Sequence, residues 1–464
     1  MRIYFKNTLG GEIELFEPIK NGEVSMYHCG PTVYSRAHIG NMRAYIFADT
    51  LKRLFLYQNY KVKQVINITD VGHLTDDGDD GEDKIEKKAR EASLRAPDIT
   101  DEITKIFFSD LKLLNINTEE TIFPKASDHI EEQIEMIQVL EQRGHTYKTS
   151  DGIYFDTSTF PAYGDLGKID ISNLKEGARI GVNEEKRNPT DFALWKFSKP
   201  EDNRQQEWNS PWGVGFPGWH IECSAMSKKY LGETFDIHTG GIDHIPVHHN
   251  NEIAQSESAN QKMQANFWLH FNHILINGEK ISKSLKNDIY LSDLLEKNIS
   301  PIVYRYWLLT ADYKTQINFT WEALKASKTA FEKLALLVSQ FEKGGEINSE
   351  YKDKFLKFIN DDLNTAKSIA LIWELIKDKN VSEKDKRETI LDFDKVLGLN
   401  LEAIANLASK MQINIPDSVQ KLIDERESAR KSGDFIKADA IREMITEEGY
   451  EVKDTPKGPE IKLL

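Results

Sequence analysis

The feature that most constrains the fold of this chain is a strand, loop, helix and strand pattern near its start. An apolar segment, Val24–Cys29, leads into a Gly30-Pro31 turn, and a helix-like stretch begins near His38. A second β-rich run, Tyr60–Thr69, alternates in polarity. This order begins a βαβ unit and therefore predicts an α/β fold with a parallel sheet that can bind a nucleotide.

The composition limits the class of protein. A chain of 464 residues with 39% hydrophobic and 29% charged residues suits a globular protein of several units. No apolar run is long enough to span a membrane, and Glu12 and Glu14 interrupt the start where a signal peptide would be apolar. We therefore expect a cytoplasmic protein. A net charge of −15 excludes nucleic-acid binding by bulk charge alone, so an RNA partner would need local patches.

Changes in pattern along the chain divide it into segments. The predicted segments are the first half of a sheet domain (1–120), a turn-rich insertion (121–218), the second half of the sheet domain (219–275), a basic loop and the region after it (276–320), a helical bundle (321–410) and a charged end piece (418–464). An acidic stretch at 76–83 is read as a solvated loop. An EF-hand starting at Asp76 would have Lys87 at position 12, where a carboxylate is required.

The chain has two cysteines, which excludes a disulfide framework and a zinc ribbon of four cysteines. Cys29 ends the first strand, at the sheet edge where ligands bind, and Cys223 falls in the first turns of a predicted helix. His248 and Glu252 are four residues apart, on one helical face. Together the four side chains make a reasonable zinc set. The sequence does not show that the cysteines meet, and each alone fits a small buried apolar residue better than a metal ligand.

Two further segments carry groups suited to phosphate. His38, Gly40 and Asn41 open the first helix, where the helix dipole attracts anions, although so short a motif is common by chance. Lys280 and Lys283 follow a buried strand on a loop that begins with glycine. They could neutralise charge as pyrophosphate leaves, or they could belong to an ordinary basic loop.

A third segment, Thr239–Asp243, follows another predicted strand. Its paired glycines, Gly240 and Gly241, allow a flat base or a ribose to approach the backbone closely. Asp243 could accept hydrogen bonds from hydroxyl groups.

The order of these motifs resembles one family. A helix-opening H-x-G-x and a later K-x-S-K-S resemble the signature pair of class I aminoacyl-tRNA synthetases. The pattern Cys29…Cys223…His248-x3-Glu252 closely resembles the cysteinyl-tRNA synthetase family. The resemblance extends from about residue 2 to about residue 460. Four longer runs also resemble that family: Tyr27–Tyr34, Asn67–Asp70, Pro217–Met226 and Phe235–His238.

The resemblance implies a Rossmann-type domain, split by a connective insertion and followed by an α-helical bundle and a small anticodon-binding domain. It implies activation of L-cysteine with ATP and Mg²⁺ to cysteinyl-adenylate, then transfer to the terminal adenosine of tRNA(Cys), initially on the 2′-hydroxyl. It also implies a monomer and one zinc ion that takes the substrate thiolate as a further ligand. Zinc prefers a thiolate to the protonated hydroxyl of serine, so the metal would act as a chemical sieve.

The resemblance also implies roles for single residues. The implied metal ligands are Cys29, Cys223, His248 and Glu252, and the implied cysteine contacts are Gly30, Thr69 and Trp219. The implied ATP contacts are His38, Gly40, Asn41, Gly240, Gly241, Asp243 and Lys283, and the implied catalytic residues are His38, Asn41, Lys280 and Lys283. Two positions depart from the family's usual pattern: Asn41 replaces a histidine, and Ile281 replaces a methionine.

The end piece matches the anticodon-binding motif of the same family. Arg430, Asp439 and Asp454 could read base edges, and Phe435 could stack on a base where some relatives have an indole. An ordinary amphipathic helix pair explains most of these charges equally well.

Two other functions share parts of this pattern. A ligase that joins cysteine to an amino sugar in mycothiol synthesis has the same zinc and ATP signatures, but the end piece favours tRNA. A catalytically silent paralogue that binds tRNA or a nucleotide would be expected to have damaged signatures, whereas His38, Gly40, Lys280, Lys283 and the four candidate ligands are all present.

Overall fold

The predicted strand, helix and strand form the centre of a parallel sheet. Strand β3 (Glu23–His28) is followed by helix α1 (Ile39–Tyr57) and by β4 (Lys61–Ile66), which pairs with β3 in parallel. Helix α1 is buried along most of its length, as the apolar residues of its sequence require. The predicted α/β fold with a parallel sheet is confirmed.

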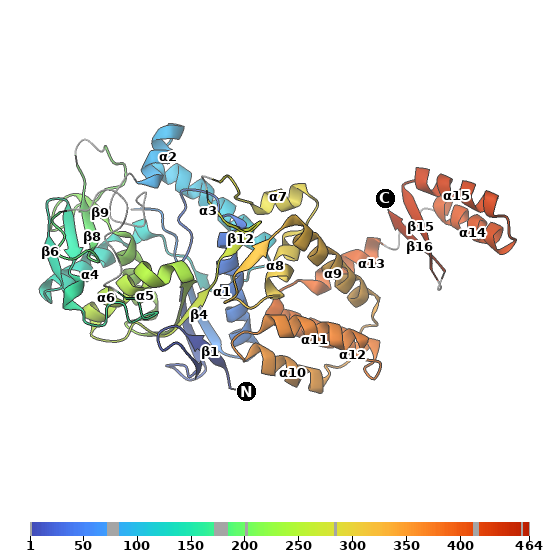
Figure 1. Ribbon diagram of the computed structural model, residues 1–464, viewed down its shortest axis with the longest axis horizontal. Coiled ribbons are helices and arrows are strands. Elements are labelled where there is room, and N and C mark those ends of the chain that lie inside the picture. The colour runs from blue at the N-terminus through green and yellow to red at the C-terminus, as the bar shows by residue number, and fades with distance from the viewer. Residues whose placement is uncertain are drawn as a thin grey trace. The chain divides into compact units, whose positions relative to one another are not determined.

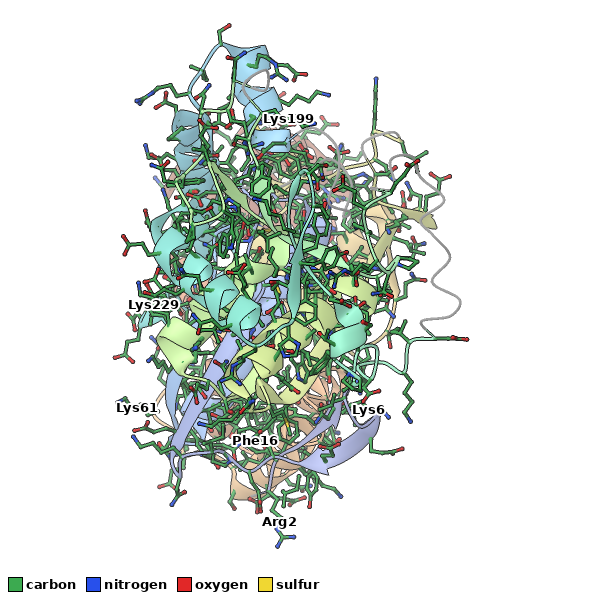
Figure 2. The ribbon with its side chains drawn as sticks, turned by 90° about the vertical axis from the view of Figure 1, so that its left-hand side faces the viewer. Arg2, Lys6, Phe16, Lys61, Lys199 and Lys229 are labelled. Atoms are coloured by element: carbon green, nitrogen blue, oxygen red, sulfur yellow. The ribbon has the colours of Figure 1, made fainter. Side chains whose placement is uncertain are left out.

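The computed structural model describes residues 2–71, 83–170, 184–199, 203–282, 285–411, 417–455 and 458–463. These residues form two units, one of 1–333 with 341–401 and one of 334–340 with 402–464. Figure 2 shows charged side chains such as those of Arg2, Lys61 and Lys229 around the outside of the larger unit. No helix in the described ranges is both long enough and apolar enough to cross a membrane.

The main sheet of the larger unit has the strand order β11-β10-β3-β4-β5, and all its neighbours are parallel. Its other strands are β5 (Thr121–Ile122), β10 (Phe235–Gly241) and β11 (Ala265–Phe271). The chain runs outward from β3 through β4 to β5, then returns to the other side of β3 as β10. The switch point between β3 and β10 is where open parallel sheets bind ligands.

Helices connect these strands. Between β4 and β5 lie α2 (Lys84–Ala92) and α3 (Ala96–Leu113), and around β10 lie α5 (Trp219–Leu231) and α6 (Asn250–Asn260). A hairpin of β1 (Tyr4–Asn7) and β2 (Glu12–Leu15) precedes the sheet.

A second, antiparallel sheet lies between β5 and α5 in the sequence. Its strands, in the order in which they pair, are β6 (Thr146–Lys148), β7 (Gly152–Phe155), β8 (Phe192–Phe197) and β9 (Gly215–Pro217). Helix α4 (Ile130–Gln142) shares an apolar core with this sheet, in which Leu140, Phe155 and Trp195 are buried. The sheet and α4 lie at one end of the larger unit (Figure 1).

A small three-stranded sheet follows β11. It contains β12 (Ile274–Ile276), β13 (Glu279–Lys280) and β14 (Ile317–Phe319), with α7 (Leu291–Glu296) and α8 (Pro301–Leu309) between the last two strands. Helices α10 (Ser349–Ile359), α11 (Thr365–Lys377) and α12 (Glu383–Leu397) pack on one another, and the rings of Phe355 and Phe393 stack at 4.2 Å. Two further helices are α9 (Trp321–Gln340) and α13 (Leu401–Met411).

The smaller unit has its own apolar core. It contains α14 (Asp417–Lys431), α15 (Phe435–Glu447) and an antiparallel hairpin of β15 (Tyr450–Thr455) and β16 (Gly458–Leu463). Ile423, Ile445 and Val452 are buried together, which fixes the helix pair against the hairpin. The predicted linker at 411–417 falls largely on residues outside those that the structure describes.

Candidate active site

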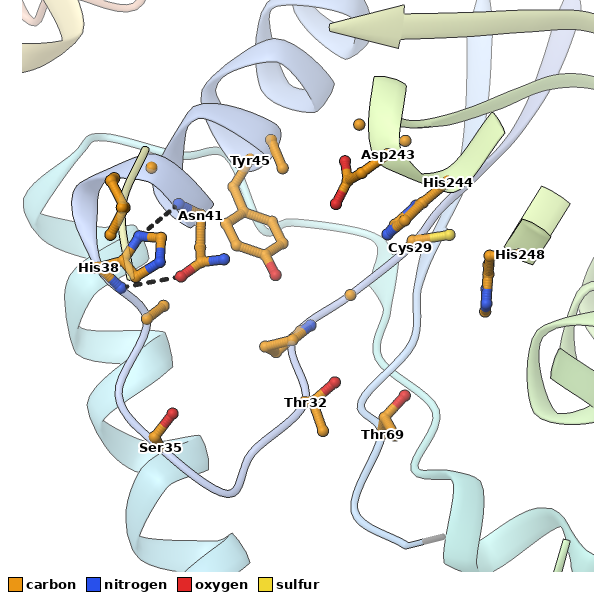
Figure 3. Close-up of a pocket in the computed structure, with 18 of the residues that line it drawn as sticks. Cys29, Thr32, Ser35, His38, Asn41, Tyr45, Thr69, Asp243, His244 and His248 are labelled. Carbon is orange, nitrogen blue, oxygen red and sulfur yellow. Dashed lines mark hydrogen bonds between the residues drawn. The ribbon is translucent and has the colours of Figure 1, made fainter. Parts of the chain in front are cut away.

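A cavity of about 500 Å³ lies at the carboxyl edge of the main sheet. Cys29 and Gly30 directly follow β3, and Gly240 and Gly241 end β10, so the cavity opens at the switch point. Figure 3 shows His38 and Asn41 on one side of it and Cys29, His244 and His248 on the other. Residues that are distant in the sequence therefore meet in one site.

The four predicted metal ligands converge beside this cavity, which Cys29, Cys223 and His248 line. One ligand atom from each of Cys29, Cys223, His248 and Glu252 lies within 4.8 Å of the others. Cys29 follows β3, Cys223 is on α5, His248 is on a π-helical turn over Ile245–His249, and Glu252 is on α6. His248 Nε2 lies 3.0 Å from Glu252 Oε1, as the spacing of four residues predicts. The geometry suits a metal ion.

The electrostatics of this cluster favour a cation. Cys29 and burial raise the pKa of Cys223 well above its usual range, because negative charges would be crowded there. Burial would lower the pKa of His248, but Cys223 and Glu252 outweigh it and raise the pKa to about 10. Thiolates and a carboxylate in so buried a place need a positive charge among them, which a divalent cation supplies.

Two further histidines, His238 and His249, lie beside the cluster. His238 donates from Nε2 to Glu252 Oε2 at 2.9 Å, and Gln264 Nε2 lies 3.4 Å from the same oxygen. His238 and His249 also form an alternative set of four donors with Cys29 and Glu252. His238 lies in the run Phe235–His238, and its contact with Glu252 was not predicted from the sequence. The sequence pattern that could have indicated this contact is a histidine on a predicted buried strand, next to the sheet edge where ligands bind.

Two of the three predicted cysteine contacts depend on a close approach of backbones. The Gly30 amide donates to Asn67 Oδ1 at 2.8 Å, and Asn67 Nδ2 donates to Thr69 Oγ1 at 3.1 Å. A Cβ atom at Gly30 would lie 1.5 Å from the Asn67 carbonyl oxygen, so only glycine fits. Asn67, which the sequence analysis did not single out, therefore holds Gly30 and Thr69 in place beside the cavity.

Trp219, the third predicted contact, lines the same cavity. Its ring centroid lies 4.5 Å from that of His248, because it is on the first turn of α5, one turn before Cys223. The indole thus forms a wall next to the metal-ligand cluster.

His38 and Asn41 cap the first turn of α1 reciprocally. The Asn41 amide donates to His38 Nδ1 at 3.2 Å, and the His38 amide donates to Asn41 Oδ1 at 3.1 Å. Because Nδ1 accepts, the neutral ring carries its proton on Nε2 and can donate from there. The main chain at position 41 therefore orients the His38 ring, while the Asn41 side chain, which departs from the family's usual histidine, holds the His38 main chain.

The two signature segments, one at the start of α1 and one around Lys280, lie against each other. Lys280 and Ile281 line the cavity together with Gly40. A Cβ atom at Gly40 would lie 2.7 Å from Ile281 Cδ1, so a larger residue would push the segments apart. Lys283 lies outside the described residues.

The predicted base-binding segment forms the opposite lip. Gly240 and Gly241 end β10, and a Cβ atom at Gly240 would lie 2.5 Å from His249 Cε1. The Asp243 side chain is 55% exposed and faces the cavity, where it can accept hydrogen bonds from hydroxyl groups.

The candidate RNA contacts of the smaller unit have different surroundings. Arg430 Nη1 lies 3.0 Å from Asp454 Oδ2, and Arg426 donates to both oxygens of that carboxylate at 2.9 Å. Asp439 is exposed on α15, and Phe435 is 60% exposed at the start of the same helix. Two of the four candidates thus pair with each other, while Phe435 offers an open ring face.

The arrangement suits a small molecule with a thiol and a nucleotide at the same time. Sulfur, imidazole and carboxylate donors lie on one side, and the start of α1 with the basic signature segment around Lys280 lies on the other. The glycines of β10 line the same cavity.

Comparisons with known proteins agree with this chemistry. The family profile described as the tRNA synthetases class I (C) catalytic domain matches residues 15–329. A cysteine–tRNA ligase 1 of Burkholderia lata is 45% identical and covers 99% of this chain and 96% of its own. A cysteine–tRNA ligase of Treponema denticola is 43% identical over 98% of both chains.

Solved structures show the same fold at low identity. A methionyl-tRNA synthetase of Mycobacterium tuberculosis, bound by methionyl-adenylate, has a TM-score of 0.54 and 14% identity over 82% of this chain and 92% of its own. The LeuRS–tRNA–LeuAMS complex from Agrobacterium radiobacter has a TM-score of 0.58 and 10% identity over 84% and 86%.

Proposed function

Because this chain belongs to the cysteine–tRNA ligases of the class I tRNA synthetase family, and is thus an aminoacyl-tRNA ligase, we propose that it activates L-cysteine with ATP and transfers it to the 3′-terminal adenosine of tRNA(Cys). One observation carries the proposal: Cys29, Cys223 and His248, which form one donor cluster with Glu252, line the same cavity as both signature segments. A thiol bound there is within reach of a nucleotide.

We propose Zn²⁺ as the metal of the cluster. Two thiolates, an imidazole and a carboxylate suit its preference for sulfur and nitrogen donors, and the buried set needs a positive charge. Held by these four residues, such an ion would supply a site that prefers the substrate thiolate to the hydroxyl of serine. His238 and Gln264 keep the Glu252 carboxylate oriented toward the cluster. Gly30, Thr69 and Trp219 would hold the rest of the amino acid.

In the first step a carboxylate oxygen of cysteine attacks the α-phosphorus of ATP, and the bond to the β-phosphate oxygen breaks to release pyrophosphate. His38 donates from Nε2, and Asn41 from its side-chain amide, to phosphate oxygens, with Mg²⁺ accompanying the nucleotide. Lys280 and Lys283 neutralise the charge that gathers on the leaving group. Gly40 leaves room for the phosphates beside the helix start.

The adenosine half of ATP would lie over the glycines of β10. Gly240 and Gly241 let the base and ribose approach the backbone, and Asp243 accepts hydrogen bonds from the ribose hydroxyl groups. This placement holds the α-phosphorus between the start of α1 and the bound cysteine.

In the second step the 2′-hydroxyl of the terminal adenosine attacks the carbonyl carbon of cysteinyl-adenylate, and AMP leaves. We propose that the connective insertion, predicted over 121–218, begins only after β5 (Thr121–Ile122), because β5 belongs to the main sheet of the halves 1–120 and 219–275. We also propose that 276–320 carries the signature loop and that 321–410 is the bundle. The end piece 418–464 would bind the anticodon through Arg430, Phe435, Asp439 and Asp454. We further propose that the protein works as a monomer in the cytoplasm.

Charging assays test the proposal. The metal-loaded chain is incubated with ATP, labelled cysteine and either tRNA(Cys) or glucosaminyl-inositol. We expect label on the tRNA. Label on the amino sugar alone would favour the mycothiol ligase, and the absence of any cysteine-dependent exchange of pyrophosphate into ATP would favour a silent paralogue.

A further inference from the structure

Arg43 is a buried cation on α1, one turn beyond His38. Its neighbours Ala44 and Tyr45 line the active-site cavity, but Arg43 itself does not. Burial lowers the pKa of Arg43 to about 10, so the guanidinium stays protonated at neutral pH. A cation in such a place needs several acceptors, and the proposed reaction steps give this side chain no part.

Four main-chain carbonyls accept hydrogen bonds from Arg43. Nη1 donates to the His273 carbonyl at 3.1 Å. Nη2 donates to three carbonyls of the 312–315 turn, those of Tyr313 and Thr315 at 2.9 Å each and that of Asp312 at 3.3 Å. The rigid, planar guanidinium can bond two segments at once, which a single amine on a flexible chain cannot do with the same geometry. Arg43 therefore joins α1 to His273 and to the turn.

Both segments support the pair of strands that carries Lys280. His273 directly precedes β12, and β12 pairs with β13, so that Leu275 lies opposite Lys280. The 312–315 turn precedes β14, which pairs with β12 in parallel. Arg43 is thus connected to Lys280 through one hydrogen bond and one strand pair.

A second set of contacts fixes the turn. The Tyr313 hydroxyl donates to Asp362 Oδ1 at 2.6 Å, and the Lys314 amine pairs with the other oxygen of that carboxylate. Asp362 and Leu363 have φ angles of 53° and 55°, in the left-handed region that residues with a Cβ atom rarely adopt. Such backbone strain persists only where the surrounding contacts impose it. The turn is therefore a firm support from which Arg43 holds the strands.

The two signature segments leave little room for a change in their spacing. A Cβ atom at Gly40 would lie 2.7 Å from Ile281 Cδ1, and the Ile39 amide donates to the Ile289 carbonyl at 2.8 Å. A misplacement of about 1 Å between reacting groups can cost about 10²-fold in rate. A shift of β13 relative to α1 would therefore move Lys280 away from the phosphates that the start of α1 holds.

We propose that Arg43 is a positioning residue for adenylate formation, which holds β12 and β13, and with them Lys280, at a fixed distance from the start of α1. The inference rests on the proposed function, because it concerns the step in which ATP activates cysteine. Arg43 touches no substrate and acts through the main chain of its neighbours. Its loss should therefore lower kcat without weakening the binding of cysteine at the metal-ligand cluster.

The test compares Arg43→Lys with Arg53→Lys in the full, metal-loaded chain. Arg53 is also on α1 and also donates to main-chain carbonyls, but these belong to Asn115 and Lys395, away from β12 and the turn. The kcat of cysteine-dependent pyrophosphate exchange should fall about tenfold or more in Arg43→Lys. The KM for cysteine should stay within about twofold of its value in the unmodified chain. Arg53→Lys should lower Tm and leave kcat unchanged.

A second readout separates positioning from a general loss of structure. Transfer from preformed cysteinyl-adenylate to tRNA(Cys) does not use Lys280 in the proposed steps, so in Arg43→Lys its single-turnover rate should change far less than exchange. Tm and zinc content show whether each variant is folded, and Arg43→Gln, which keeps an N–H donor without the charge, takes the place of Arg43→Lys if that chain does not fold.

Four results would overturn the proposal: an unchanged kcat in the folded Arg43 variant, an equal loss of kcat in Arg53→Lys, a rise in KM alone, or an equal fall in exchange and transfer. An unmodified chain without cysteine-dependent exchange would refute the proposed function instead. The two failures are therefore distinguishable.

Discussion

The Sγ atoms of Cys29 and Cys223 lie within 4.8 Å of each other, although one follows a strand of the first half of the sheet and the other is on a helix of the second half. The insertion between these halves brings the chain back to the switch point, where β10 returns beside β3. The cluster therefore depends on the split sheet, and it joins the two halves at the site of chemistry.

Replacing Cys223 by serine should remove the metal. The hydroxyl of Cys223→Ser stays protonated and is a poor zinc ligand, so the KM for cysteine should rise at least tenfold while the affinity for ATP changes little. Elemental analysis and exchange kinetics measure both effects. Ser227→Ala, one turn further along α5, is the control and should keep its zinc. Unchanged zinc content in Cys223→Ser would refute the ligand assignment.

Replacing Lys280 by alanine should slow the first chemical step. The side chain lines the active-site cavity beside Gly40, and removing one cation from a developing phosphate charge costs about 10²-fold or more in rate. The KM for cysteine should change less than kcat in the exchange assay. Lys286→Ala, also exposed and on the same loop, should behave like the unmodified chain. A pure rise in KM would contradict the assigned role of Lys280.

Replacing Phe435 by alanine should weaken tRNA binding without changing pyrophosphate exchange. The ring is 60% exposed at the start of α15, and loss of one base–aromatic stack costs about 1–3 kcal/mol. Met444, which is 52% exposed on the same helix, provides the control Met444→Ala. Equal tRNA affinities for the two variants would show that Phe435 does not stack on a base.

A buried ion pair predicts how stability depends on pH. Burial would raise the pKa of Asp49, but Arg305 and Arg53 outweigh it and hold the pKa below its usual range. Asp49 Oδ2 lies 2.5 Å from Arg305 Nη2, and both side chains are fully buried. Asp49→Asn should therefore destabilise the protein by about 3–5 kcal/mol at neutral pH, because Arg305 is left buried with one partner fewer.

The pH dependence follows from the direction of this pKa. A carboxyl whose pKa is lower in the folded state stabilises it above the unfolded value, about 3.9, and this stabilisation is lost as the pH falls through the folded value. The difference in Tm between the unmodified chain and Asp49→Asn should thus shrink below about pH 4. Asp98→Asn, in an exposed pair with Arg95, should change Tm little at any pH. A difference that grows on acidification would contradict this account.

Much of this fold could be predicted from local patterns, because each element is short and its pattern of apolar and polar residues is clear. The run Val24–Cys29 corresponds to β3 and the sheet edge that follows it. The four-residue spacing of His248 and Glu252 was enough to place both side chains on one face. The helix pair of the end piece is also present, as α14 and α15.

Contacts between distant segments could not be predicted in the same way. Nothing in the local sequence indicates that Asn67 lies under Gly30, or that His238 turns its Nε2 atom to Glu252, since these contacts arise from strand order. The capping of α1 by His38 and Asn41 is a local contact, but it was missed because Asn41 was read as a phosphate donor.

The central claim is that a metal held by Cys29, Cys223, His248 and Glu252 selects cysteine for activation. Its most direct test is cysteine-dependent exchange of pyrophosphate into ATP by the same preparation before and after a chelator removes the metal. We expect the KM for cysteine to rise steeply with metal loss and to recover when Zn²⁺ is added back. An unchanged KM in the metal-free chain would contradict the claim.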